Sequence, residues 1–107
     1  MQHWDLGPLT AKARRSGPRY QEFHRAPAMS LGLYRLRAGE ADEQKPHRQD
    51  EFYYVLEGRA RFTSGGATRQ VEAGELLWVP AREEHRFHDI EADLLLLVGF
   101  APAEGPA

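Results

Sequence analysis

The sequence predicts a single all-β domain, either a small sandwich or a barrel, and two observations lead to this prediction. Ten glycines and seven prolines interrupt the 107-residue chain at short intervals, which suits short strands joined by turns better than helices. From residue 29 onward the apolar residues show no sustained 3.6-residue period. A chain of this length can bury one hydrophobic core without disulfides, and it contains no cysteine.

Seven segments have the composition of strands, because they are rich in β-branched, aromatic and aliphatic residues and are bounded by turn residues. Residues 63–68 are expected to form a hairpin turn around Gly65 and Gly66, since glycine takes positive φ angles at little cost. Gly74 marks a second turn, and Gly58 is expected to end a strand. The expected strands span 29–37, 51–57, 59–63, 68–72, 75–80, 84–89 and 93–100.

The two ends of the chain are expected to lie outside the central β-domain of residues 29–100. Residues 1–28 form an expected N-terminal extension, in which 9–17 is interpreted as a short helix or a basic loop. Within the same extension, 19–25 is interpreted as an edge strand or a dimer arm. Residues 101–107 have little to bury and are expected to form a flexible tail.

The composition gives no sign of a nucleic-acid or membrane partner. The formal net charge is -2, so no basic surface for nucleic acid or an anionic membrane is expected. No apolar run approaches the roughly 18 residues of a membrane-spanning helix. The N-terminus also lacks the features of a signal peptide, and we expect a cytoplasmic protein. Arginine far outnumbers lysine and asparagine is absent, which favours a thermophile, although a GC-rich genome gives the same arginine bias.

Two histidines and a carboxylate are the main candidates for chemistry. On a straight strand His47 and Glu51 would lie about 13 Å apart, at roughly 3.3 Å per residue. Residues 48–50 have turn composition, however, and a reversal there would let Glu51 face His47. His85 begins a later expected strand. Together the three supply the two-histidine, one-carboxylate set that suits a divalent transition metal with open coordination positions.

The segment around His47 resembles the first motif of the cupin superfamily. In family terms this motif is Gly, five residues, His-x-His, three or four residues, Glu, six residues and Gly. Gly39, His47, Glu51 and Gly58 match it in order and spacing.

The segment around His85 resembles the second motif of the same family, through Gly74, five residues, Pro80 and then His85. Fifteen residues separate Gly58 from Gly74, which is the short spacing of compact cupins. The resemblance covers residues 29 to 100. It implies a single-domain cupin double-stranded β-helix, a jelly-roll β-barrel of about eight to ten strands.

The chain departs from the family pattern at three positions. The glycine of the second motif is replaced by Arg82 and its final asparagine by Asp89, which are turn substitutions that a fold tolerates. The first histidine of His-x-His falls on Lys45. This change removes a metal ligand, because an ammonium group cannot ligate unless it is deprotonated.

Three arrangements would account for the missing ligand. In the first, the amide oxygen of Gln44 replaces the histidine, although alternation along a strand would point position 44 away from His47. In the second, His47, Glu51 and His85 bind the metal and water completes the coordination. In the third there is no metal, and Lys45 joins these three side chains in a pocket for an anionic ligand.

Three other residues are candidates for the ligand pocket. Tyr53 has the same parity as Glu51 along its strand, so its hydroxyl could reach a bound ligand. Phe87 shares the strand face of His85. Arg35 is either exposed to solvent or lines the mouth of the barrel, where it would bind a carboxylate or phosphate.

The resemblance implies one of two functions. The first is a metal-dependent enzyme, with zinc, manganese, iron or nickel, that acts on a small polar organic molecule. Isomerase, cyclase, decarboxylase or dioxygenase chemistry would suit it, with Glu51 and Tyr53 assisting proton transfer. The second is a non-catalytic module that binds a sugar or a small anion without metal. A homodimer is expected in either case. Some short cupins with a segment like residues 46–58 are described as antibiotic or polyketide biosynthesis proteins. This resemblance suggests a biological context and does not indicate a reaction.

Overall fold

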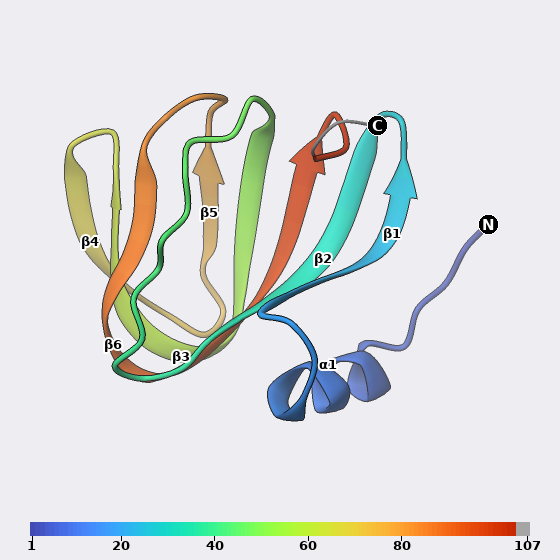
Figure 1. Cartoon of the computed structure of the whole chain (residues 1–107), viewed down its shortest axis with the longest axis horizontal. Helices are drawn as coiled ribbons and strands as arrows, with labels where there is room; N and C mark the ends of the chain where they lie inside the picture. The colour runs from blue at the N-terminus through green and yellow to red at the C-terminus, as the bar shows by residue number, and fades with distance from the viewer. Residues whose placement is uncertain (105–107) are drawn as a thin grey trace.

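An antiparallel sheet of six strands makes up most of the computed structural model, which describes residues 1–104 (Figure 1). The strand order is β1-β2-β6-β3-β4, and β5 pairs with another part of β3. The all-β prediction is therefore confirmed. The elements are α1 (Leu6–Arg15), β1 (Tyr20–Ala26), β2 (Met29–Leu36), β3 (Asp50–Ser64), β4 (Ala67–Glu72), β5 (Leu76–Val79) and β6 (His85–Ala101).

Two long strands, β3 and β6, replace four of the expected strands, so the described chain has six strands rather than eight to ten. Each of these strands bends sharply, so that its two parts lie on opposite sides of the folded sheet (Figure 1). Gly58 does not end a strand, contrary to the prediction; it lies at the bend of β3 with a φ of 98°. A Cβ atom there would lie 2.3 Å from the carbonyl oxygen of Asp93, so only glycine allows β6 to approach this closely.

The inner faces of the bent sheet enclose the main hydrophobic core, in which Leu36, Val55, Phe87 and Leu96 are completely buried. Helix α1 covers part of the outer face, where its Ala13 joins a second buried cluster on β2 and β6. The N-terminal extension thus contains the helix that was one of its two interpretations, followed by an edge strand, β1. No helix among residues 1–104 has the length and apolar character needed to cross a membrane.

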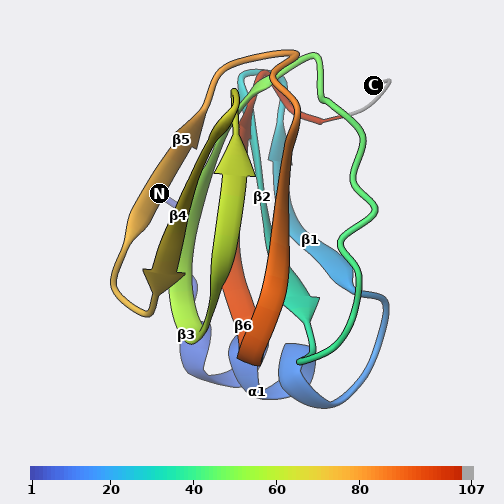
Figure 2. The same ribbon diagram turned by 90° about the vertical axis from the view of Figure 1, so that its left-hand side faces the viewer.

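Residues 37–49 form an irregular segment between β2 and β3, and they contain no strand. Figure 2 shows this segment running along the open side of the sheet toward the start of β3. The chain bends at residues 48 and 49, as their turn composition predicted, but no strand precedes this bend. His47 reaches the site on an irregular segment, whose path is set by side-chain contacts instead of a strand ladder.

The end of the chain returns against the turn between β1 and β2. The backbone N–H of Ala103 donates to the carbonyl oxygen of Pro27 at 3.3 Å, and that of Glu104 donates to Ser30 Oγ at 3.1 Å. Residues 101–104 of the expected flexible tail are thus held in place, and residues 105–107 lie outside the described part of the chain.

Candidate metal site

Glu51 and His85 meet inside the bend, at the start of β3 and of β6. Glu51 Oε1 lies 3.0 Å from His85 Nε2, and each side chain is 1% exposed. Both carboxylate oxygens and Nε2 nevertheless lack a hydrogen-bond partner of suitable geometry among residues 1–104. Burying polar atoms without hydrogen-bond partners costs free energy. A cluster of such atoms in a native protein therefore indicates a ligand or ion that completes their contacts.

The backbone orients the ring of His85. Its Nδ1 lies 2.8 Å from the carbonyl oxygen of Glu83; because that oxygen can only accept, Nδ1 carries the hydrogen and Nε2 faces Glu51. Burial lowers the pKa of His85, but the Glu51 carboxylate and the Glu83 carbonyl outweigh it and the pKa is raised overall. In the absence of a cation, the Glu51 carboxylate stabilises the protonated form of His85. A bound metal ion would occupy the place of that proton.

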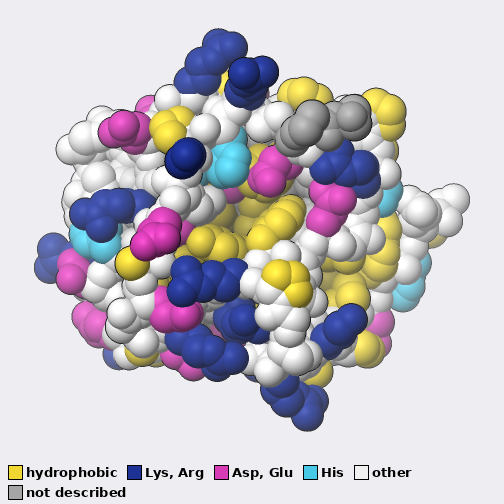
Figure 3. Space-filling model, in the orientation of Figure 1, with side chains coloured by type: hydrophobic (Ala, Val, Ile, Leu, Met, Phe, Trp, Pro, Cys, Tyr) yellow, Lys and Arg dark blue, Asp and Glu magenta, His cyan; other side chains and the backbone are white. Residues whose placement is uncertain are grey.

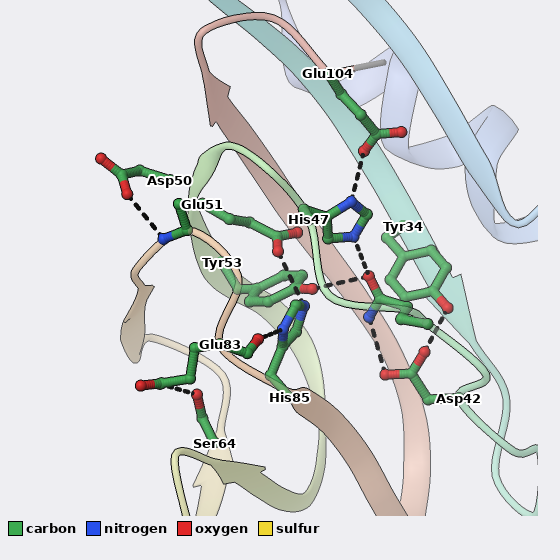
Figure 4. Close-up of polar contacts among 12 residues, drawn as sticks. Tyr34, Asp42, His47, Asp50, Glu51, Tyr53, Ser64, Glu83, His85 and Glu104 are labelled. Atoms are coloured by element: carbon green, nitrogen blue, oxygen red, sulfur yellow. Dashed lines mark hydrogen bonds and ion pairs between the residues drawn. The ribbon is translucent and has the colours of Figure 1, made fainter. Parts of the chain in front are cut away.

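His47 completes the group from the irregular segment. Its ring packs against Phe100, with centroids 4.9 Å apart, and its carbonyl oxygen accepts a 2.6 Å hydrogen bond from the backbone of Arg82. Arg82 has a φ of 68°, the left-handed conformation that suits the glycine of the cupin motif. One ligand atom from each of His47, Glu51 and His85 lies within 4.8 Å of the others. The structure thus brings the three predicted ligands together (Figure 4).

Gln44 also points into the site, although strand alternation predicted the opposite. That argument fails because residues 37–49 are not a strand. Gln44 Nε2 donates to Asp42 at 2.9 Å, which leaves Oε1 facing the Tyr53 hydroxyl at 3.0 Å and His47 Nε2 at 3.3 Å. Burial and the nearby Glu51 carboxylate raise the pKa of Tyr53 well above its usual value, so its hydroxyl keeps the proton and donates to Gln44.

Asp42 is a site residue that the sequence analysis missed. It is 8% exposed and accepts hydrogen bonds from the Tyr34 hydroxyl at 2.8 Å, from Gln44, and from the backbone N–H of Phe87 at 2.9 Å. Burial and the Asp42 carboxylate raise the pKa of Tyr34. The sequence contained no signal for this role, because Asp42 lies in a polar segment whose neighbouring acids are exposed or half-buried.

Glu104 is a second residue that the sequence analysis missed. Its Oε2 lies 3.7 Å from His47 Nδ1 (Figure 4), whereas Gln44 faces the other ring nitrogen, Nε2. Burial raises the pKa of Glu104, while the nearby His47 acts against this shift. The sequence contained no signal for this position either, because the residues around it suggest a tail.

Two pairs of donor atoms lie at separations that suit a divalent ion. With bonds of about 2.1 Å, adjacent donors lie about 3.4 Å apart around a tetrahedral ion and about 3.0 Å apart around an octahedral one. The Glu51 to His85 separation is 3.0 Å, and the His47 to Gln44 separation is 3.3 Å. Imidazole and carboxylate donors also suit manganese, iron and nickel. The donor set therefore fits a metal.

Comparison with known proteins identifies the family. The family model described as Cupin domain matches residues 32–98 of the chain. The chain belongs to the cupin family. An uncharacterized protein of Streptomyces coelicolor is 46% identical over 104 residues, covering 97% of this cupin and 99% of the relative. Both the fold and the family expected from the two motifs are therefore confirmed.

Solved structures agree with this assignment. TT1209 from Thermus thermophilus is 29% identical, with a TM-score of 0.74 and coverage of 96% of this cupin and 99% of that chain. The DMSP lyase DddQ from Ruegeria pomeroyi is 19% identical, with a TM-score of 0.69 and coverage of 81% of this cupin and 51% of that chain. Identity as low as that of the lyase shows a shared fold alone, and fold does not select a reaction.

The remaining pocket candidates of this cupin, Lys45, Arg35 and Phe87, lie in different places. Lys45 is exposed. Arg35 donates to carbonyl oxygens at and just after the end of α1, at 2.8 to 3.2 Å, so it does not line the barrel mouth, which was one of its two interpretations. The physical reason is that those carbonyls, at a helix end, attract a cation on the outer face of β2. Phe87 is completely buried beneath the site, and its ring centroid lies 5.0 Å from that of Tyr53.

A hollow of about 160 Å³ opens beside two of the three candidate ligands, His47 and Glu51. Figure 3 shows a depression in this face of the cupin, floored by hydrophobic side chains, with a histidine and acidic side chains beside it. The hydroxyl of Tyr20 is buried in this hollow without a partner among the described residues, and burial raises its pKa. The hollow is lined by Tyr20, Tyr34, Gln44, His47, Glu51, Tyr53, Val98, Phe100 and Glu104.

Proposed function

We propose that this cupin binds a divalent transition metal through His47, Glu51 and His85 and acts on a small polar organic molecule in the adjoining hollow. The observation that carries the proposal is the buried group of Glu51 and His85 atoms without hydrogen-bond partners. A cation would compensate the Glu51 charge and use the lone pair of His85 Nε2. We assign no metal identity among zinc, manganese, iron and nickel.

Gln44 is the best candidate for the place left by the missing histidine. Its amide nitrogen is held by Asp42, so its amide oxygen is the atom that faces His47. An amide oxygen is a hard donor that can complete a site of nitrogen and carboxylate ligands. Lys45 is exposed, which weakens the alternative of a metal-free pocket built around its ammonium group.

The hollow indicates the kind of substrate. Its volume of about 160 Å³ lies below the roughly 300 to 1,000 Å³ of pockets for drug-sized ligands. Tyr20 offers a buried hydroxyl to a substrate oxygen, and Tyr53 holds a second proton nearby. A bound metal would supply Lewis-acid polarisation of a carbonyl or hydroxyl oxygen. These features favour a small oxygen-rich substrate and isomerase, cyclase or decarboxylase chemistry.

Metal analysis of protein purified without added metal tests the proposal. We expect about one ion per chain in the wild type and nearly none in His85→Ala, because the variant loses a ligand from a site of three. His88→Ala is a matched control on the strand of His85, since the His88 ring contacts Thr63 on β3 and Asp89 on β6 and does not contact the site. A wild type without metal, even after reconstitution with each of the four ions, would contradict the proposal and favour the non-catalytic binding module.

We also propose that the cupin forms a homodimer through the outer face of β3 and β5. Leu76 and Trp78 on β5 are 68% and 64% exposed, and they lie opposite Tyr54 and Phe52 on the same face. An apolar patch beside a strand paired on one edge favours self-association. Light scattering should give twice the chain mass for the wild type and one chain mass for Trp78→Glu. Met29→Glu, at another exposed apolar position, should leave the dimer intact; a monomeric wild type would contradict the proposal.

A further inference from the structure

The carboxylate of Glu104 reaches the candidate site from beyond the end of β6. Its Oε2 lies 3.7 Å from His47 Nδ1, and its side chain is 32% exposed. This separation is that of an ion pair and exceeds a hydrogen bond. Glu104 also lines the hollow of about 160 Å³. It therefore contributes negative charge beside one predicted ligand without belonging to the group of His47, Glu51 and His85.

The backbone of Glu104 is held in place by three contacts. Its N–H donates to Ser30 Oγ at 3.1 Å, and Ser30 is completely buried. The preceding residue, Ala103, donates to the carbonyl oxygen of Pro27 at 3.3 Å. Arg25 donates to the carbonyl oxygen of Glu104 and pairs with Glu22. Because these contacts already order the backbone, only side-chain freedom is lost when the carboxylate settles beside His47.

The ring of His47 lies between two different acceptors. Its Nε2 faces the amide oxygen of Gln44 at 3.3 Å, and its Nδ1 faces the carboxylate of Glu104. A neutral imidazole has one hydrogen, so the two acceptors compete for it. The full negative charge of Glu104 attracts the N–H dipole beyond hydrogen-bond distance, whereas Gln44 offers only an amide dipole. This charge favours the hydrogen on Nδ1 and leaves the lone pair of Nε2 directed toward the site.

We propose that Glu104 is a positioning residue that holds His47 with its hydrogen on Nδ1, so that Nε2 is free to bind the metal. The second ring nitrogen of a metal-bound histidine commonly donates a hydrogen bond to a carboxylate, and this partner fixes the ring and raises its basicity. The inference rests on the proposed metal-binding function. It assigns to the C-terminal segment a role in completing the half of the site in which this chain lacks the first histidine of the family motif.

The metal affinity of the Glu104 variants tests this role. Competition with a chromophoric chelator should show zinc binding about 10- to 100-fold weaker in Glu104→Ala, as is usual when such a partner is lost. Glu104→Gln keeps an acceptor oxygen and should recover part of the affinity. Glu91→Ala is the matched control, because its carboxylate is exposed and paired with Arg59 on the sheet away from the site; its affinity should equal that of the wild type.

The tautomer of His47 gives a second readout that does not depend on metal. Long-range ¹H–¹⁵N spectra of the metal-free protein, at a pH where His47 is neutral, should show the hydrogen on Nδ1 in the wild type. In Glu104→Ala it should move to Nε2, because the carboxylate charge beside Nδ1 is gone and the amide oxygen of Gln44 beside Nε2 remains. An unchanged tautomer, or zinc binding within twofold of the wild type in Glu104→Ala, would overturn the inference alone. A wild type that binds no metal would overturn the proposed function and this inference together.

Discussion

The two histidines of the site are held in different ways. His85 begins a regular strand, its side chain is 1% exposed, and a backbone carbonyl two residues earlier orients its ring. His47 lies on the irregular segment, its side chain is 22% exposed, and its ring is flanked by the side chains of Gln44 and Glu104. One half of the site is thus built by the sheet, and the other half by side chains from separate parts of the chain.

This difference explains how the chain departs from its family at position 45. Lys45 replaces a motif histidine in the irregular half, where the path of the backbone decides which side chain points inward. Here Gln44 points inward, held by Asp42, and Lys45 is exposed. In the regular half, the register of β3 and β6 leaves no such choice, and both Glu51 and His85 occupy the expected places.

The largest effect is expected where β3 bends to build the regular half. A methyl group in Gly58→Ala would meet the backbone oxygen of Asp93 at 2.3 Å, on a backbone with a φ of 98°. Clash and strain together should lower the free energy of unfolding by about 4 kcal/mol, measured by urea denaturation. Gly66→Ala is the matched control: its φ is 81° and no atom lies within 4 Å of the added carbon, so about 1 kcal/mol is expected. Equal losses in both variants would contradict this account of the bend.

The irregular half should depend most on Asp42. Asp42→Ala removes the acceptor for the Tyr34 hydroxyl, Gln44 and the Phe87 backbone. Unfolding should become easier by about 3 kcal/mol, because hydrogen bonds to a buried charge are lost and buried donors stay unpaired. The exposed neighbour Glu43 serves as control; Glu43→Ala should stay within about 0.5 kcal/mol of the wild type. Similar stability of the two variants would show that the segment is held by other contacts.

Metal should join the two halves and stabilise the fold. At a free metal concentration 100 times Kd, binding to the native state adds about 2.7 kcal/mol, which for a domain of this size is on the order of 10 °C in Tm. Adding a chelator to metal-loaded wild type should remove this increment in a thermal scan. His85→Ala should show no metal-dependent Tm at all, and His88→Ala should behave as the wild type. A chelator-insensitive Tm in metal-loaded wild type would contradict a site that spans both halves.

The smallest effect is expected when the motif histidine is restored. Lys45→His should change zinc affinity by less than about threefold, because position 45 is exposed and Gln44 occupies the inward place. Chelator competition measures this, with Lys45→Ala as the control for loss of the ammonium charge. Tenfold tighter binding by Lys45→His alone would show that the irregular segment can rearrange to present a second histidine, and that the two halves differ less than the structure indicates.

Much of the fold and part of the site followed from the sequence by itself. Turn residues and the absence of a helical period predicted the all-β domain, and motif spacing correctly grouped His47, Glu51 and His85. Such signals are local, because turns depend on a few adjacent residues and strand faces alternate every second residue. They identified most strands, though not their continuity through Gly58.

Only the tertiary structure decided the surroundings of the candidate metal ligands. The alternation rule gave the wrong direction for Gln44, since no ladder fixes the parity of residues 37–49. Arg35 was drawn to the carbonyls at the end of α1, and Asp42 and Glu104 reached the site through contacts with residues far away in the chain. Contacts between distant segments depend on how the whole sheet bends; Gly58 permits the bend of β3, but the packing of the whole sheet sets its direction.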